Sequence, residues 1–577
     1  MAVAAAATLL AAGCGGAGTA PGVPGDGGGE GPAAASIVEV QGAGHLSPLA
    51  GRRVVVTGVV TAVGEEGFYL QDPAGDGDPA TSEGVFVATP GASGRSVGDR
   101  VEVTGTVREH VPGGTDTENL SVTRIEASGL ELLEEGAALP GPVVLGSGGR
   151  IPPQVEVIGD EELPVDLRDP DEAAANEFDP DEEGIDFYES LEGMRVRVPG
   201  PVAVSPLERF GERDAELWVL SEGGAHVTPA GARTFRGGIL LQPHPENRGG
   251  QNPERIQLQY DPAVTGAAAP SLAVGSELGD ASGVVSYAFG NYEVVLTAAP
   301  EAEPAAYGDE TTELEGTSQA ITVASYNVLN LNPLPETADR VARIAEHVAG
   351  RLRAPDVVAL QEIQDEGGTE GGEEDTTTDA SGTLRALVDA IEAAGGPRYR
   401  AFDVAPAPNS SGGVPGGNIR NAFLYDPGRV ELVGHRALTP EALRDVGARD
   451  PEAFQGSRDP LAARFVFGGD TITVINNHLT SRFGSTPIFG AVHPFEQAGE
   501  EARAAQARAL HDVVAARLAE DPDAAVVVLG DMNTFQWTDD LDRLLPGEGD
   551  PILYDLLLDV PADERYSYLF EGNSQAL

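Results

Sequence analysis

The stretch AVVVLGDMNTF at residues 525–535 decides the fold of the carboxy-terminal part of this chain. Its apolar run predicts a buried strand, and Asp531 and Asn533 follow directly where that strand ends. Polar groups at strand ends reach solvent while the apolar residues stay in the sheet, so a scaffold can gather a site from distant sequence. The same two residues also fit an Asx turn that closes the strand.

Three other predicted strands end in the same way. They are ITVASYNVLNL (321–331), PDVVALQEIQD (355–365) and TITVINNHLTS (471–481). Their terminal polar residues are Asn327, Glu362 and His478. Alone, Glu362 fits an ordinary surface carboxylate and His478 a structural histidine. Four such endings in one region are hard to explain as coincidence, and they predict a shared site.

Around these strands the sequence pattern alternates between predicted strands and helices, whereas the front of the chain is β-rich. Helical patterns at 336–353, 380–394 and 496–519 separate the carboxy-terminal strands. Short β-type runs between Gly, Asp and Pro turns fill the front, as in RRVVVTGVVTAV (52–63) and DRVEVTGTV (99–107). Five strands at this spacing indicate a small barrel of the OB-fold type, and a second β-rich unit follows.

These patterns predict a multidomain chain: two small OB-like β-barrel units followed by a carboxy-terminal α/β domain. The predicted segments are a lipoprotein-type signal peptide (1–13), a flexible tether (14–36), an OB-like domain (37–150), an acidic linker (151–184), a second OB-like unit (185–300), a second linker (301–317) and the α/β domain (318–577).

Composition excludes several classes of protein. The net charge is −56, and every basic residue is an arginine. A broad basic face that grips nucleic acid is therefore excluded, although a catalytic contact through a few arginines and a divalent cation is not. The single cysteine excludes a disulfide scaffold and a multi-cysteine metal site.

That one cysteine, Cys14, ends the apolar run MAVAAAATLLAAGC at residues 1–14. The run is too short to span a membrane, and Ala-Ala-Gly-Cys resembles the bacterial lipobox, in which the cysteine is lipidated. The alternative is an alanine-rich tail with an incidental thiol. We expect an extracellular or cell-surface bacterial protein that meets the membrane only through a lipid anchor at Cys14.

The four carboxy-terminal motifs resemble those of the endonuclease/exonuclease/phosphatase superfamily, the deoxyribonuclease I-like fold. The resemblance implies a four-layered α/β-sandwich and metal-dependent phosphodiester hydrolysis. In the front half, GRRVVVTGVVTAV (51–63) and GFYLQDPAGDGDPATSEGVFV (67–87) resemble the β domain of secreted bacterial nucleases. Together they imply an extracellular nuclease whose substrate is DNA or RNA, and no protein partner is inferred.

The resemblance also implies roles for the matching residues. Glu362 would ligate Mg²⁺ or Mn²⁺, and Asn327 would contact the scissile phosphate and order the metal site. His478 would bond a phosphate oxygen or assist proton transfer. Asp531 would orient or deprotonate the attacking water, and Asn533 would hold a phosphate oxygen.

Arg420, within GGNIRNAFLYD (416–426), matches a basic phosphate contact of the family more loosely. The family also carries a later Asp-His pair and a Ser-Asp-His element, whereas this chain ends YSYLFEGNSQAL (566–577). We therefore expect the α/β domain to be incomplete at its carboxy terminus and the 577-residue chain to be an inactive fragment of an active hydrolase. A decayed pseudoenzyme is the alternative.

A second cation site is a further hypothesis. DPAGDGDPATSE (72–83) places Asp72, Asp76, Asp78 and Glu83 in one Gly-rich turn, where oxygen ligands could bind Ca²⁺. The alternative is an acidic turn that closes the barrel.

Two other functions stay open besides the nuclease. One is a phosphatase or phospholipase-type phosphodiesterase of the same superfamily, which would use the same catalytic residues. The other is a non-enzymatic surface binding protein with a decayed catalytic domain.

Overall fold

The computed structural model describes residues 31–89, 91, 94–159, 163–210, 214–227, 232–241, 251–266, 268–370, 372–546 and 551–577. Cys14 and the predicted signal peptide lie outside the described residues. The chain divides into two compact units. Unit 1 consists of Met1–Ala306, Ser485–Glu496 and Pro561–Gln575, and unit 2 of Tyr307–Gly484, Gln497–Val560 and Ala576–Leu577. Within the described residues, no helix combines the length and apolarity that a membrane crossing requires.

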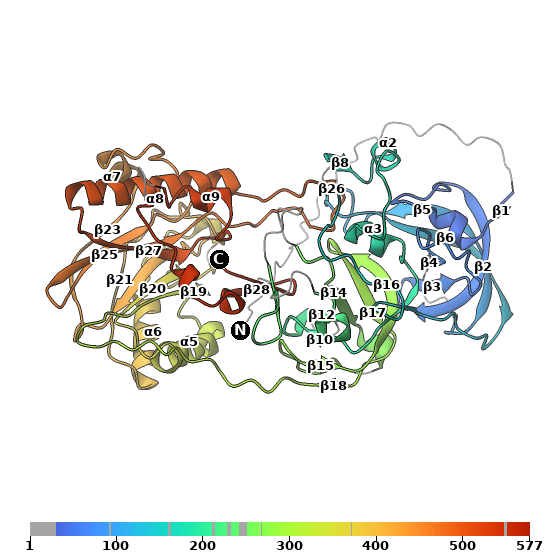
Figure 1. The fold of residues 1–577 in the computed structure, drawn as a ribbon, viewed down its shortest axis with the longest axis horizontal. Helices are drawn as coiled ribbons and strands as arrows, with labels where there is room; N and C mark the ends of the chain where they lie inside the picture. The colour runs from blue at the N-terminus through green and yellow to red at the C-terminus, as the bar shows by residue number, and fades with distance from the viewer. Residues whose placement is uncertain are drawn as a thin grey trace. The chain divides into compact units, whose positions relative to one another are not determined.

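The first sheet of unit 1 is built from the strands predicted for the front of the chain (Figure 1). Its strands are β1 (Ala33–Ala34), β2 (Arg53–Val63), β3 (Gly67–Gln71), β4 (Gly84–Ala88), β5 (Arg100–His110) and β6 (Val122–Glu134). They run in the order β1-β2-β3-β4-β6-β5, and β5 also pairs with β2, so five strands form a ring of pairings. Alternate residues such as Val54, Val56, Phe68 and Leu70 fill its core. The five strands are confirmed, and their OB-like character stays a prediction.

A short helix packs onto this core. Helix α1 (Ile37–Gln41) begins at Ser36, whose hydroxyl accepts a hydrogen bond from the backbone N–H of Glu39. The Glu39 carboxylate accepts one from the backbone N–H of Ser36 in return, which completes a capping box. Ile37 and Val40 then join the first sheet's core.

The second sheet of unit 1 has ten strands and differs from the small barrel predicted for 185–300. Its strands are β18 (Ala302–Glu303), β15 (Glu277–Leu278), β10 (Val202–Ala203), β12 (Asp214–Leu220), β14 (Ile256–Tyr260), β17 (Asn291–Leu296), β16 (Ala281–Ala288), β9 (Arg195–Val198) and β7 (Val143–Val144) in that order, with β11 (Glu208–Phe210) on β12. No pairing between described strands joins the two ends of this order. The helices of this region are α2 (Pro170–Ala173), α3 (Gly184–Glu189) and α4 (Pro262–Thr265).

The stretch 151–184, predicted as an acidic linker, contributes to the core of this second sheet. Val157, Val165 and Leu167 are buried there. Leu163, Val165 and Leu167 do alternate as in a strand, but the run is short and lies among acidic residues, so the sequence pattern favours a linker.

Two segments from late in the chain complete unit 1. Strand β26 (Val492–His493) pairs with β8 (Val165–Asp166), and Phe489 lies in the core with its ring 5.8 Å from that of Tyr188 and 5.9 Å from that of Tyr292. Strands β28 (Tyr568–Phe570) and β29 (Asn573–Gln575) form a small sheet with β13 (Ile239–Leu240). Residues 1–306 alone therefore do not hold the whole core of this unit.

Unit 2 contains two four-stranded sheets. The first has the order β19 (Val323–Leu331), β20 (Val357–Ile363), β22 (Arg420–Tyr425) and β21 (Arg400–Asp403); the second has β23 (Glu431–Ala437), β24 (Leu461–Phe467), β25 (Asp470–His478) and β27 (Ala525–Asp531). The helices are α5 (Ala338–Glu346), α6 (Ser381–Ala393), α7 (Pro440–Asp445), α8 (Glu500–Glu520) and α9 (Asp539–Asp542).

The layers of unit 2 follow from where its apolar residues are buried. Phe423 of the first sheet packs with Phe465 and Val474 of the second, so the two sheets lie face to face. Helices α5 and α6 cover the outer face of the first sheet, and α8 covers that of the second (Figure 1). This helix–sheet–sheet–helix order confirms the predicted four-layered α/β-sandwich.

Candidate active site

Two buried amides join the sheets of unit 2 next to the predicted site. Gln361 Nε2 of β20 donates to Asn476 Oδ1 of β25 at 2.7 Å, and both side chains are buried. Asn476 Nδ2 also donates to the carbonyls of Leu360 at 2.9 Å and Ala422 at 3.0 Å in the other sheet. Buried polar groups require such partners. The pairing fixes the position of β25 relative to β20, one residue before Glu362.

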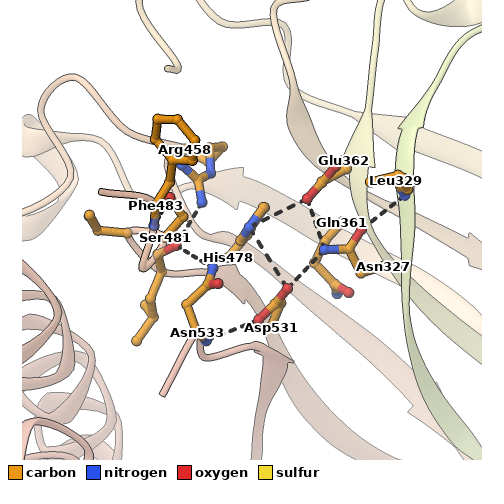
Figure 2. A network of polar contacts seen from close by, with 12 residues as sticks. Asn327, Leu329, Gln361, Glu362, Arg458, His478, Ser481, Phe483, Asp531 and Asn533 are labelled. Carbon is orange, nitrogen blue, oxygen red and sulfur yellow. Dashed lines mark hydrogen bonds and ion pairs between the residues drawn. The ribbon is translucent and has the colours of Figure 1, made fainter. Parts of the chain in front are cut away.

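The residues predicted from the four strand ends come together in one network (Figure 2). Asn327 Nδ2 donates to Glu362 Oε1 at 3.0 Å and to Asp531 Oδ2 at 2.8 Å. His478 Nε2 lies 3.8 Å from Glu362 Oε1 and 3.9 Å from Asp531 Oδ2. Two carboxylates, an amide and an imidazole from four strands thus converge, as the sequence predicted.

The backbone is irregular at the residues that carry these side chains, and this irregularity sets their orientation. Glu362 has a φ of 63°, in the left-handed region that costs free energy for a non-glycine residue. The β19–β20 register shifts between Asn327 and Leu331, in the manner of a β-bulge. Within this irregular segment the backbone N–H of Asn330 donates to Glu362 Oε2 at 2.9 Å. The distortion therefore coincides with the residues that define the site.

Asp531 has a structural and a site-facing oxygen. Its Oδ1 accepts from the backbone N–H of Asn533 at 2.9 Å, which is the Asx turn considered as the alternative. Its Oδ2 points to Asn327. The preceding Gly530 has a φ of 139°, and a Cβ there would collide with the carbonyl of Asn477 on β25. Only glycine allows β27 to approach β25 this closely.

Asn533 holds the loop that follows the histidine. Its Nδ2 donates to the carbonyl of Leu479 at 3.0 Å, and Arg458 Nη2 donates to the same carbonyl at 2.6 Å. Leu479 comes directly after His478, so both donors also fix the imidazole.

Arg458 is a site residue that the sequence analysis missed. It is 7% exposed, and its Nε has no hydrogen-bond partner within the described residues. Burial lowers the pKa of Arg458, and the negative charges of Glu362 and Asp531 oppose that shift. It lies in the loop before β24, where no strand-end pattern marks it. Of Ser457, Arg458 and Asp459 only the arginine is buried, and the burial of a loop residue leaves no signal in the sequence.

His478 is neutral at ordinary pH. Burial and the nearby positive charge of Arg458 lower the pKa of His478 to about 3, against a smaller opposing effect of Asp531. Its buried Nδ1 has no partner in the described part of the chain. A neutral imidazole offers one N–H donor and one acceptor.

Arg420 is bonded differently from the predicted phosphate contact. Its Nε and Nη2 donate to the carbonyl of Asn418 at 3.0 and 2.8 Å, and its Nη1 bonds the Thr378 carbonyl and lies 3.2 Å from Asp403 Oδ2. The guanidinium ties together two loops and the end of β21. Phosphate contact by Arg420 stays a prediction.

The acidic turn at 72–83 uses its carboxylates locally. Asp72, Asp76 and Asp78 each accept a hydrogen bond from the backbone N–H two residues later, at 2.9, 2.9 and 3.0 Å. Across the described residues, no group of three or more His, Cys, Asp or Glu side chains is arranged to hold a metal ion. Both the Ca²⁺ site at Asp72, Asp76, Asp78 and Glu83 and the acidic-turn alternative stay predictions for this loop.

The network around Asn327 fits a divalent cation by its chemistry. Glu362 and Asp531 bring two carboxylates to the same amide, and the adjacent imidazole is neutral. Mg²⁺ binds oxygen ligands and usually takes only one or two protein carboxylates, with water and substrate phosphate supplying the rest. Glu362 and Asp531 supply the two carboxylates of that requirement, and, because no group of three or more His, Cys, Asp or Glu among the described residues is arranged to hold a metal ion, water and substrate phosphate would have to supply the rest.

The fold and the site define the class of protein. A four-layered α/β-sandwich whose strand ends join Asn, Glu, His and Asp around one point is a scaffold for phosphoester hydrolysis. Residues 324–574 match the endonuclease/exonuclease/phosphatase family, and the carboxy-terminal part of this chain belongs to that superfamily. Membership supports phosphodiester hydrolysis as its activity. Residues 144–305 match a domain of unknown function.

The solved structures that match this chain share little sequence with it. The humanized TDP2 of D. rerio is 18% identical over 43% of this chain and 75% of its own, with a TM-score of 0.27. TDP2 of D. rerio in complex with a single-strand DNA product is 18% identical over 39% of this chain, which spans only 64% of that protein, with a TM-score of 0.23. The human nocturnin catalytic domain with bound sulfate is 16% identical over 44% of this chain and 80% of its own, with a TM-score of 0.28. No curated protein matches this chain.

Proposed function

We propose that this protein is a divalent-metal-dependent nuclease that hydrolyses phosphodiester bonds of DNA or RNA outside the cell. The observation that carries the proposal is the convergence of Glu362 and Asp531 on one Asn327 amide, beside the neutral imidazole of His478. A phosphodiester is negatively charged and repels hydroxide, so its hydrolysis needs a cation, fixed donors and a local base.

Each group has a role that its contacts allow. Glu362 would hold Mg²⁺ or Mn²⁺, which supplies charge stabilisation to the phosphate, and Asn327, whose Nδ2 bonds both carboxylates while its Oδ1 accepts from the backbone N–H of Leu329, would order the metal site. Asp531 Oδ2 would accept the proton of the attacking water. His478 would donate its one N–H to a phosphate oxygen or to the leaving oxygen. Asn533 retains a second N–H on Nδ2 for a phosphate oxygen after it has bonded Leu479.

Arg458 adds a positive charge that the sequence analysis did not provide. Its Nε–H has no partner within the described residues. Preorganised donors stabilise the negative charge that develops on the phosphate, and we propose that Arg458 is one of them.

The proposal specifies nucleic acid because of the front half of the chain. The strands β2, β3 and β4 carry the sequence that resembles the β domain of secreted bacterial nucleases. Export follows from the lipobox-like ending at Cys14, which would leave the protein extracellular or on the cell surface.

The test is hydrolysis of supercoiled plasmid and of bis(p-nitrophenyl) phosphate, with Mg²⁺, Mn²⁺ or EDTA, by the purified natural protein together with any residues that follow Leu577. This is the full-length protein of the other experiments as well. We expect both substrates to be cleaved with metal and neither in EDTA. Hydrolysis confined to phosphomonoesters or phospholipids would replace the nuclease with the alternative member of the superfamily. Plasmid cleavage that persists in EDTA would refute the metal-dependent mechanism.

A further inference from the structure

A buried ion pair joins helix α8 to the two loops that leave the candidate active site. Arg503, in the first turn of α8, is 0% exposed, and its Nε donates to Asp540 Oδ2 of α9 at 2.8 Å. Asp540 is 2% exposed. Because both side chains are buried, any effect of this pair on the site must act through the residues that it bonds.

One side of the pair holds the loop that follows His478. Arg503 Nη1 donates to the carbonyl of Ala498 at 2.8 Å and to that of Thr480 at 3.3 Å. Gln506, one turn further along α8, accepts from the backbone N–H of Thr480 and donates to its hydroxyl, both at 2.9 Å. Thr480 comes two residues after His478, so α8 fixes the backbone close to the imidazole.

Thr480 and Ala498 also flank the segment in which the chain leaves unit 2. Residues 485–496 belong to unit 1, and the chain returns to unit 2 at Gln497. Arg503 bonds the chain on both sides of this excursion. The guanidinium therefore restrains the end of β25 against movement of the segment 485–496.

The other side of the pair holds the loop that follows β27. The hydroxyl of Thr534 lies 2.9 Å from Asp540 Oδ1 and 3.1 Å from Asp540 Oδ2, and Thr534 is 1% exposed. Thr534 comes directly after Asn533, whose Nδ2 bonds the Leu479 carbonyl of the first loop. The two loops are therefore joined twice, at the site through Asn533 and Leu479, and further from it through Asp540 and Arg503.

Stability does not explain why these two charges are buried. Taking an arginine and an aspartate out of water costs free energy that their attraction offsets only in part, and well-packed apolar residues in their place are often as stable or more stable. Arg503 Nη2 is also buried without a hydrogen-bond partner among the described residues, which adds to the cost. The pair does supply direction, because the planar guanidinium holds its donors in a rigid fork.

We propose that Arg503 and Asp540 are positioning residues for the reaction, and that their ion pair sets the distance between His478 and the turn formed by Asp531 and Asn533. A reacting geometry is sensitive to such a support, since a misplacement of about 1 Å reduces a rate by about 10²-fold. The proposal rests on the proposed hydrolysis of phosphodiesters and assigns two further residues to it.

The experiment compares two ion pairs of the same helix in the full-length protein. The test variant is Arg503→Met/Asp540→Leu, which replaces the buried pair by apolar side chains. The matched control is Arg508→Met/Asp450→Leu, because Arg508 Nε also lies 2.8 Å from an oxygen of Asp450, but these side chains are 33% and 34% exposed. The measurements are kcat and KM for bis(p-nitrophenyl) phosphate in Mn²⁺, the Tm, and hydrogen exchange of the backbone amides of residues 479–484 and 531–538 by mass spectrometry.

We expect the test variant to lose about 10²-fold in kcat, with a KM and a Tm close to those of the wild type, and to exchange faster in both loops. Arg503→Lys should keep the Tm and recover only part of kcat, since lysine returns the charge without the fork. The control variant should match the wild type in every measurement.

Thr534→Val tests the same link if the double variant does not fold. It removes only the hydroxyl that joins the loop to Asp540, and kcat should fall by about tenfold, the rate equivalent of one hydrogen bond to a charged group.

Wild-type kcat and wild-type exchange in the folded test variant, or in Thr534→Val where the test variant is unfolded, would overturn the positioning role and leave the nuclease. An equal loss of kcat in the test and control variants would also overturn it, because the loss would not depend on the buried pair. Faster exchange in both loops of a protein that hydrolyses no diester would remove the nuclease and leave the pair as the link that fixes these loops.

Discussion

His478 and Asp531 are register partners on the neighbouring parallel strands β25 and β27, and His478 Nε2 lies 3.9 Å from Asp531 Oδ2. Register partners on parallel strands project to the same face of the sheet. The site therefore depends on strand pairing, and its geometry is as rigid as the core beneath it. Changes of charge at the site should alter chemistry with little effect on folding.

Replacing Glu362 by Gln should abolish metal-linked stabilisation. A ligand that binds only the folded state at a hundredfold its Kd adds about 2.7 kcal/mol of stability. We expect Mg²⁺ or Mn²⁺ to raise the Tm of the wild type and to leave that of Glu362→Gln unchanged, as measured by differential scanning fluorimetry. Glu431→Gln, on the exposed end of β23, is the control. An equal metal shift in both variants would place the cation elsewhere.

Replacing Arg458 by Met should reduce kcat for diester hydrolysis by about 10²-fold, as the loss of one preorganised donor commonly does. Arg458→Lys should recover part of the activity, because it returns the charge without the second donor. The exposed Arg464 on β24 supplies the control variant Arg464→Ala. If Arg458→Met kept full turnover, the phosphate role of this arginine would be wrong.

Replacing Phe489 by Ala should destabilise unit 1 by about 3–5 kcal/mol, the usual cost of removing a buried phenylalanine. Phe489 is 2% exposed and packs on Tyr188 and Tyr292, although it belongs to a segment that follows β25 in sequence. Urea denaturation measures the loss. The exposed Phe289→Ala should change stability by less than about 0.5 kcal/mol. Equal stability of the two variants would mean that residues 485–496 do not support this core.

The stability of unit 1 should fall as the pH rises above neutrality. Burial alone lowers the pKa of His45, but hydrogen bonds to Asp186 and Glu189 and their negative charges outweigh it and raise the pKa to about 10. A raised histidine pKa contributes stability that is complete below the unfolded value of 6.5 and is lost as the pH rises toward 10.

Buried carboxyls act in the same direction. Burial raises the pKa of Glu254 and of Glu293 to about 8, so the folded state favours their protonated forms and loses stability as the pH rises from 4.5 to 8. The variant His45→Gln separates the contributions. Its Tm should depend less on pH between 8 and 10 than that of the wild type, and an identical pH profile would exclude His45 as a source.

Strand-end polarity predicted that these residues lie together, because sheet geometry brings the ends of neighbouring strands to one edge. Asn327, Glu362, His478 and Asp531 were all found from apolar runs that end in a polar residue. Arg458 was not predicted, because a loop residue that reaches the network through tertiary packing leaves no periodic signal in the sequence. The hydrogen bond between Gln361 and Asn476 was not predicted either, because a contact between two sheets cannot be read from either strand alone.

The fold of unit 2 was predictable for the same reason, as its strands and helices have clear periods. The front of the chain was predicted less well beyond its first five strands. The second sheet there includes β7, the core of unit 1 includes Phe489, and β28 and β29 form a small sheet with β13. Contacts between segments hundreds of residues apart depend on loop paths that local pattern does not encode.

The most direct test of the whole account is the rate at which full-length His478→Ala cleaves plasmid DNA in Mn²⁺, compared with the wild type and with His435→Ala. His435 is an exposed histidine of β23 in the same unit. Loss of an aligned proton donor or acceptor reduces a rate by about 10²–10⁴-fold. We predict that loss for His478→Ala alone, with an unchanged Tm. Equal rates for the two variants would contradict the assignment of this network as the active site.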